Sequence, residues 1–241
     1  MKKKEKILIS GCSKGLGYDL YKSLKSNFNV FGLSSNKETC KKKNIFYYNP
    51  LENPKIDKTL EENIKKINVD HVVHCSGGGF KQHDKFLKLE KLILLFNVNF
   101  FSLYEINKCL IKNKQNEKKL NIILIGSIAS LENDKGSIGY SASKTLLLNY
   151  NKLLAAKFKN QNVISKLIIP GTFKSTNGSM NRLKKSQNKI FNSIQSQMPN
   201  KKFQSSKDIN SVISFLLTKE SNLLNGSYVS LANLETTSIF L

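Results

Sequence analysis

The stretch KILISGCSKGLG, residues 6–17, places a short apolar run directly before three glycines. The run has the length of a buried strand, and the apolar residues after it recur at helical spacing. A strand that turns sharply into a helix needs glycine for positive φ angles and for close approach of the backbone to a ligand. The new helix points its N-terminus at that ligand, which favours an anion. The stretch therefore predicts either a phosphate-binding turn or an ordinary strand-to-helix connection.

The alternation of strand and helix continues along the chain. Strands are predicted over 6–10, 29–34, 44–49, 70–76, 121–127, 163–169 and 227–232, and helices over 17–27, 55–67, 91–113, 140–159 and 206–219. This pattern predicts an α/β fold, with a parallel sheet of about seven strands and helices on both faces. The length of 241 residues suits a single domain over 1–241.

One segment breaks the alternation. Residues 172–203 are polar, rich in Ser, Asn, Gln and Lys, and contain no predicted strand. A long loop inside a compact domain is usually a lid or a disordered segment. We expect this loop to decide substrate specificity, and its composition favours a polar substrate.

The composition excludes several classes of protein. The net charge is +22, but the lysines are spread along the chain and a single arginine is present, which favours a solvated basic surface over nucleic-acid binding. No apolar run approaches the roughly 20 residues that span a bilayer, so no membrane association is expected. Four scattered cysteines predict reduced thiols in a cytoplasmic protein. His71 and His74 would point to opposite faces of a strand, so we expect no metal site.

The end of the second predicted strand bears on the choice of cofactor. A site for NAD commonly has an acidic residue there, about 20 residues after the glycine turn. Here the stretch is GLSSNKE, residues 32–38, with Ser34, Ser35 and Lys37 and no acid at the strand end. Lys14 within the glycine turn, together with the serines and Lys37, would suit the 2′-phosphate of NADP(H), or Lys14 could be a solvated loop lysine. The pattern favours NADP(H) over NAD(H).

Tyr140 and Lys144 stand four residues apart at the start of the predicted helix 140–159. That spacing places both side chains on one helix face. A tyrosine with a pKa near 10 is a poor acid or base at neutral pH, whereas a neighbouring ammonium favours the phenolate. The pair could be a proton donor with its partner, or ordinary surface residues.

Several short motifs follow one another on the predicted elements. They are the glycine turn after Ser10, HCSGG at 74–78, NVNFFSL at 97–103, IILIGSIAS at 122–130, GYSASK at 139–144 and Pro170-Gly171 followed by Ser175. Ser127 precedes Tyr140 by thirteen residues. With this set in order, the chain resembles the short-chain dehydrogenase/reductase family over nearly its whole length.

The resemblance implies a Rossmann-like doubly wound fold and hydride transfer between a nicotinamide and a carbonyl or secondary alcohol. Tyr140 would be the general acid in reduction and the base in oxidation. Lys144 would lower its pKa and hold the nicotinamide ribose, Ser127 would bind the substrate oxygen, and Asn99 would anchor a water in a proton relay. The expected cofactor-binding residues are Gly11, Ser13, Lys14, Gly15, Leu16, Gly17, Ser34, Ser35, Lys37, Asn49, Ser76, Gly77, Tyr140, Lys144, Pro170, Gly171, Phe173 and Ser175.

The chain also departs from the family pattern. Asn49 stands where an aspartate is frequent, Ser76 replaces a small alanine, and VSLANLE at 229–235 lacks a glycine pair. The substrate therefore stays open between a 3-oxoacyl-[acyl-carrier-protein], which a basic surface would suit, and a sugar or nucleotide sugar. A non-catalytic NADP(H)-binding protein is the alternative, and nucleic-acid binding ranks last. The resemblance implies a homodimer or homotetramer.

Overall fold

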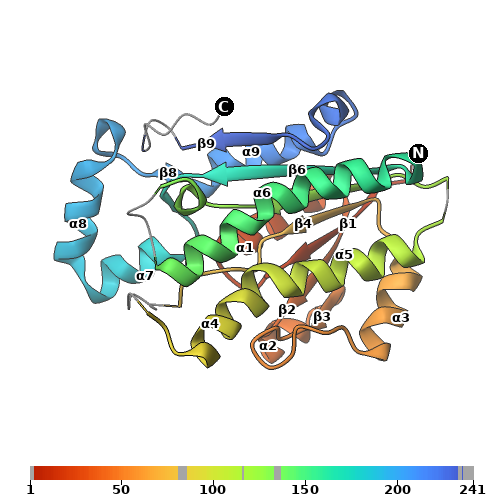
Figure 1. The fold of residues 1–241 in the computed structure, drawn as a ribbon, viewed down its shortest axis with the longest axis horizontal. Coiled ribbons are helices and arrows are strands. Elements are labelled where there is room, and N and C mark those ends of the chain that lie inside the picture. The colour runs from red at the N-terminus through yellow and green to blue at the C-terminus, as the bar shows by residue number, and fades with distance from the viewer. Residues whose placement is uncertain (1–2, 81–85, 116, 133–136, 233–234, 236–241) are drawn as a thin grey trace.

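A computed structural model describes residues 3–80, 86–115, 117–132, 137–232 and 235. Seven parallel strands form one sheet in the order β3-β2-β1-β4-β5-β6-β9 (Figure 1). Their bounds are β1 Lys6–Ser10, β2 Asn29–Ser34, β3 Ile45–Tyr47, β4 His71–His74, β5 Leu120–Ile125, β6 Val163–Pro170 and β9 Tyr228–Leu231. The chain winds outward from β1 in one direction and from β4 in the other, which is the predicted doubly wound α/β fold.

Helices cover both faces of this sheet. On one face lie α3 (Lys58–Ile67), α5 (Ser102–Asn113) and α6 (Ile138–Phe158), and on the other lie α1 (Gly15–Ser23) and α9 (Ser206–Leu216). Each set of helices buries its own apolar cluster against the strands. Every residue of β5 is buried, because both of its faces are covered. The prediction from continuous apolar runs is therefore confirmed.

The predicted helix 91–113 is divided by a change in helical winding. Residues Leu89–Phe96 form α4, Asn97–Phe101 form a π-helical turn, and α5 then begins at Ser102. Its backbone hydrogen bond from the Ser102 N–H to the Asn97 carbonyl spans five residues. Such insertions in α-helices are frequent at functional sites. The turn places Asn99 within the wide part of the helix.

The segment 172–203 differs from the expected loop. It contains β7 (Phe173–Lys174), α7 (Ser179–Ser186) and α8 (Asn188–Gln197), and β7 pairs with β8 (Gln204–Ser205). Phe191 is buried, and its ring lies 5.2 Å from that of Phe203. The ammonium of Lys174 lies 5.0 Å from both ring centroids. A small aromatic cluster with a cation–π contact thus orders a segment whose polar composition predicts no core.

In Figure 1, α7 and α8 lie beyond the ends of the strands where the arrowheads point. The turn after β1 and the connections after β4, β5 and β6 leave the sheet at that same carboxyl edge. A parallel sheet collects its ligand-binding loops there, beside the point where the strand order reverses. The remaining helix, α2 (Lys37–Cys40), follows β2, and short 3-10 turns occupy Leu24–Ser26, Ile128–Ser130, Lys159–Gln161, Pro199–Lys201 and Glu220–Leu224.

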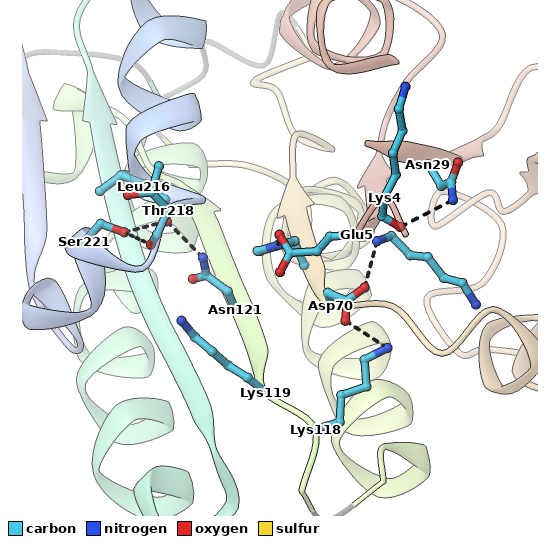
Figure 2. Close-up of polar contacts among 12 residues, drawn as sticks. Lys4, Glu5, Asn29, Asp70, Lys118, Lys119, Asn121, Leu216, Thr218 and Ser221 are labelled. Atoms are coloured by element: carbon cyan, nitrogen blue, oxygen red, sulfur yellow. Dashed lines mark hydrogen bonds and ion pairs between the residues drawn. The ribbon is translucent and has the colours of Figure 1, made fainter. Parts of the chain in front are cut away.

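The opposite, amino edge of the sheet carries a polar cluster (Figure 2). Asn121 and Ser221 both donate to the carbonyl of Leu216, the last residue of α9, at 2.9 Å. The fully buried Lys166 donates to the same carbonyl and to the Ser221 hydroxyl, each at 2.7 Å. A cation at a helix C-terminus interacts favourably with the negative end of the helix dipole. These bonds tie α9 to β5 and β6.

Candidate active site

The glycine turn after β1 is tight. The N–H groups of Gly11 and Cys12 both donate to the Leu33 carbonyl, at 2.9 and 3.1 Å, and Gly11 has a φ of +71°. A Cβ on Gly17 would overlap the Gly11 carbonyl oxygen. The N-cap of α1 is Lys14, whose side chain makes no capping hydrogen bond, and the first turn holds no acid. The turn and the N–H groups of this helix end beyond that of Gly15, which donates to the Thr176 carbonyl, therefore fit a pyrophosphate.

The loop after β4 lies against two of the predicted catalytic residues. A Cβ on Gly77 would lie 2.9 Å from the Asn99 Oδ1 and 3.0 Å from the Lys144 Nζ. A larger residue here would require these two side-chain ends to shift, and Gly77 also has a φ of +156°, which L residues rarely adopt. Asn99 and Lys144, which are far apart in sequence, therefore both lie beside Gly77.

Asn99 is fully buried and all of its amide bonds are made within the protein. Its Oδ1 accepts from the Gly78 N–H at 2.9 Å, and its Nδ2 donates to the Gly78 and Leu95 carbonyls at 3.1 and 2.9 Å. The side chain therefore fixes the loop after β4 in place. Both of its N–H groups are used, so a relay water at this residue would have to donate to the Oδ1 or bond to the main chain.

Tyr140 and Ser127, two of the predicted catalytic residues, lie beside each other. Ser137 caps α6 by accepting from the Tyr140 N–H at 3.3 Å, and the start of the helix packs closely on α4, where a Cβ on Gly139 would lie 2.8 Å from Leu92. Burial raises the pKa of the Tyr140 hydroxyl, and a hydrogen bond with Ser127 acts in the opposite direction. The Ser127 hydroxyl also accepts from the Ala129 N–H at 3.2 Å.

The expected effect of Lys144 on Tyr140 is not seen in this arrangement. The Lys144 Nζ donates to the Ile125 carbonyl at 2.8 Å, at the end of β5. Burial lowers the pKa of Lys144 to about 8. The pKa of Tyr140 is raised, and the opposing influence is the Ser127 hydrogen bond. The Lys144 ammonium is directed to the strand end in this structure, and the lowering of the Tyr140 pKa by Lys144 stays a prediction.

The connection after β6 crosses over the glycine turn. The Gly15 N–H donates to the Thr176 carbonyl at 2.7 Å, and the buried Ser175 places its Oγ 3.7 Å from the position a Cβ on Gly15 would take. Gly171 donates to the Leu231 carbonyl of β9 at 3.1 Å. The structure thus brings Ser175 to the glycine turn, while Phe173 packs at the edge of the adjacent apolar cluster.

Comparison with known proteins adds to this geometry. The model of the short chain dehydrogenase family matches residues 5–187. The chain belongs to this family. It is therefore an oxidoreductase that acts on a CH–OH or carbonyl group with a nicotinamide cofactor.

A relative from Buchnera aphidicola subsp. Baizongia pistaciae, "3-oxoacyl-[acyl-carrier-protein] reductase FabG", is 29% identical and covers 95% of this chain and 96% of its own. The solved structure "ElxO with NADP Bound" has a TM-score of 0.79 at 24% identity, covering 97% of this chain and 100% of its own. "4-hydroxyisoleucine dehydrogenase complexed with NADH" has a TM-score of 0.78 at 20% identity, covering 95% and 97%. These two structures show that the family fold is shared.

Two predicted cofactor residues have their side chains engaged elsewhere. The buried Ser34 accepts from the Asn36 N–H at 3.0 Å, and the Asn49 Oδ1 accepts from the Leu51 N–H at 3.2 Å. By contrast, Ser13 and Ser76 are partly exposed, and Lys14, Ser35 and Lys37 are exposed at the same edge. The Lys37 ammonium lies 5.7 Å from the Tyr47 ring centroid. Leu16 and Pro170 are buried and support the turn and the end of β6.

Several polar contacts near the carboxyl edge involve residues to which the sequence assigns no role in the site. His74 lies at the end of β4, where its Nε2 bonds to the Asn107 Oδ1 at 2.8 Å, and burial lowers its pKa to about 4. Glu235 accepts from the Thr172 N–H and hydroxyl, both at 2.5 Å, and so ties the VSLANLE stretch to the connection after β6. Asn233 and Leu234 of that stretch lie outside the described residues. No local pattern marks these contacts, because each partner is distant in sequence.

Neither a metal-binding cluster nor a membrane-spanning helix is found within the described residues. They contain no group of three or more His, Cys, Asp or Glu side chains that could hold a metal ion. Among them, no helix combines the length and apolar character needed to cross a membrane.

Proposed function

We propose that this protein is an NADP(H)-dependent carbonyl reductase in which Tyr140 is the proton donor. The observation that carries the proposal is the placement of Ser127 and Tyr140 beside each other at the carboxyl edge of the sheet, close enough for Ser127 to lower the pKa of the Tyr140 hydroxyl, with Lys144 one helical turn further along α6. A nicotinamide cofactor, when bound, supplies the hydride.

The side chains divide the remaining work. Ser127 hydrogen-bonds the substrate oxygen and stabilises the charge that develops there. Tyr140 gives its proton to that oxygen, for which the phenol must be protonated. Burial raises its pKa and so makes it a weaker acid, whereas Ser127 acts in the opposite direction. Lys144 contributes a positive charge beside the loop that contains Gly77, and Asn99 holds that loop in position.

The preference for NADP(H) rests on charge at the end of β2. The residues at that position include the exposed Ser35 and Lys37 and no acid at the strand end, and Lys14 is exposed in the glycine turn. Two lysines favour a 2′-phosphate, whereas an acid would favour the ribose hydroxyl of NAD. The structures named above include one with NADP and one with NADH, so the shared fold does not decide between the two cofactors. The preference therefore depends on the residues of this chain.

A 3-oxoacyl thioester on an acidic carrier protein is the substrate class we propose to test first. The Buchnera relative that this chain matches over most of its length carries that activity in its name. Residues 172–207 also contain eight basic side chains and no acidic one, and an acidic carrier would complement such a segment. A sugar carbonyl, the polar alternative, makes no use of this charge.

The test is oxidation of NADPH or NADH by the purified protein with a 3-oxoacyl thioester and a sugar carbonyl. The variant Tyr140→Phe should lower kcat by about 10²-fold or more, because it removes the proton but keeps the ring. Tyr104→Phe, on the exposed side of α5, is the matched control and should leave the rate unchanged. A Tyr140→Phe rate equal to wild type would refute Tyr140 as the donor. Tight NADPH binding without turnover would favour a non-catalytic binding protein.

The single domain, the homodimer or homotetramer and the cytoplasmic location stay predictions. Sedimentation of the purified protein would decide the oligomeric state.

A further inference from the structure

Asp19 joins three segments that are far apart in the sequence. It lies in the second turn of α1, half-buried, and one of its carboxylate oxygens accepts two hydrogen bonds. The Thr176 N–H donates to this Oδ2 at 3.0 Å, and the Ser206 hydroxyl donates to it at 2.6 Å. Thr176 lies between β7 and α7, and Ser206 is the first residue of α9.

Thr176 is also held through its other main-chain group. Its carbonyl accepts from the Gly15 N–H at 2.7 Å, so both polar groups of its backbone are bonded to α1. Within the described part of the chain, these two bonds are the hydrogen bonds that attach residues 172–178 to α1. Gly178 and Asn181 donate to the Ser175 carbonyl at 2.9 and 2.8 Å, which makes the same segment a compact turn.

A negative charge at Asp19 is unexpected so close to a helix end that is proposed to bind an anion. A carboxylate one turn from the N-terminus of α1 weakens the attraction of that helix end for an anion. It gains two hydrogen bonds in return, and bonds to an ionised acceptor are stronger than bonds between neutral groups. The contacts therefore indicate that the carboxylate serves to hold the segment 172–178 rather than to touch a phosphate.

We infer that Asp19 is a positioning residue for the cofactor, because it holds residues 172–178 against the glycine turn. This inference rests on the proposed function, in which the turn binds a dinucleotide. A segment that is already ordered before binding loses less conformational freedom when the ligand arrives. Without the carboxylate, Thr176 keeps one bond to α1, and residues 172–178 are held less firmly against the turn.

The test compares three variants of the full chain. Asp19→Ala removes both bonds, whereas Asp19→Asn keeps an acceptor oxygen and removes the charge. Asp57→Ala is the matched control, because Asp57 caps α3 by accepting from the Leu60 N–H at 2.8 Å and lies outside this site. The measurements are hydrogen exchange of the Thr176 N–H in the free protein and the Kd for NADPH by fluorescence titration.

We expect Asp19→Ala to speed exchange at Thr176 and to raise the Kd for NADPH by about tenfold, from the loss of a charge-assisted bond. Asp19→Asn should restore both values to within about threefold of wild type. Asp57→Ala should change neither. These results together would support the positioning role.

Three outcomes would overturn it. Asp19→Ala with unchanged exchange and Kd would show that Asp19 holds nothing that matters to the cofactor. Tighter NADPH binding by Asp19→Ala than by Asp19→Asn, which lacks the same charge, would show that the attached segment obstructs the site. Asp19→Asn with normal exchange but a Kd as poor as Asp19→Ala would assign the effect to charge. Wild-type protein that binds neither NADPH nor NADH would instead refute the proposed function, and with it this role.

Discussion

Lys144 has a buried ammonium whose partner is a main-chain carbonyl. Burial lowers its pKa to about 8, well below the ordinary value of 10.5, so the group loses its proton within the range of ordinary assays. The neighbouring Tyr140 has a raised pKa and keeps its proton over that range. In the folded protein, Lys144 therefore loses its proton before Tyr140. A free tyrosine and a free lysine have similar pKa values, with that of tyrosine slightly lower.

This order predicts the pH dependence of reduction. Lys144 is charged below about pH 8 and neutral above it. If its charge supports the reaction, kcat/KM for reduction should be level below that value and then fall by up to about tenfold per pH unit. The measurement is kcat/KM for NADPH-dependent reduction from pH 6 to 10. Lys144→Met should be slow and should lack this alkaline limb; an unchanged limb in this variant would assign the titration to another group.

At the scale of elements, two features that the sequence did not predict contribute to the site. The π-helical turn at Asn97–Phe101 sets the Asn99 amide against the loop after β4, and α7 and α8 form beyond the carboxyl edge. Both depend on contacts between side chains that are distant in sequence. A helix in water needs tertiary packing of its apolar face to be stable at this length. For α8, that packing is provided by Phe191.

A substitution at Phe191 tests the origin of this order. Phe191→Ala should lower the free energy of unfolding by about 3 kcal/mol, because it removes a fully packed ring. It should also speed hydrogen exchange in α7 and α8, since the ring contacts to Phe203 and Lys174 disappear. Ile190→Ala on the same helix is the control, because Ile190 is 49% exposed. Equal effects of the two variants would contradict a role for the aromatic cluster.

At the scale of the whole molecule, the two edges of the sheet carry different groups of polar residues. The loops of the carboxyl edge carry the candidate site, whereas the amino edge carries Lys166, Asn121 and Ser221 around the end of α9. Burial lowers the pKa of Lys166 to about 8. A lysine with a lowered pKa in the folded state binds fewer protons than it does in the unfolded chain between that value and 10.5.

Lys166 should therefore contribute more favourably to stability as the pH rises. Between pH 7 and 9, the difference in free energy of unfolding between wild type and Lys166→Met should move toward wild type by about 1 kcal/mol. Urea denaturation of both proteins at several pH values measures this difference, and titrations common to both cancel. Lys65→Met, an exposed position on α3, controls for the loss of one positive charge. A difference that does not change with pH would show that Lys166 keeps an ordinary pKa.

The sequence alone determined the succession of strands and helices along the chain and the positions of the motifs. Strands covered on both faces appear as continuous apolar runs, so β1, β5 and β6 are visible without tertiary information. The spacing of Ser127, Tyr140 and Lys144 likewise placed them on a strand end and a helix start. Local periodicity is enough for such predictions, because each depends on neighbours in the chain.

Only the tertiary structure decided which polar atoms are already bonded. The Asn99 amide is used by Gly78 and Leu95, and the Lys144 ammonium is directed to the Ile125 carbonyl. Asp19 meets Thr176 and Ser206, which lie 157 and 187 residues further along the chain. A hydrogen bond depends on where two atoms lie in space, and no pattern within one segment records a partner from another.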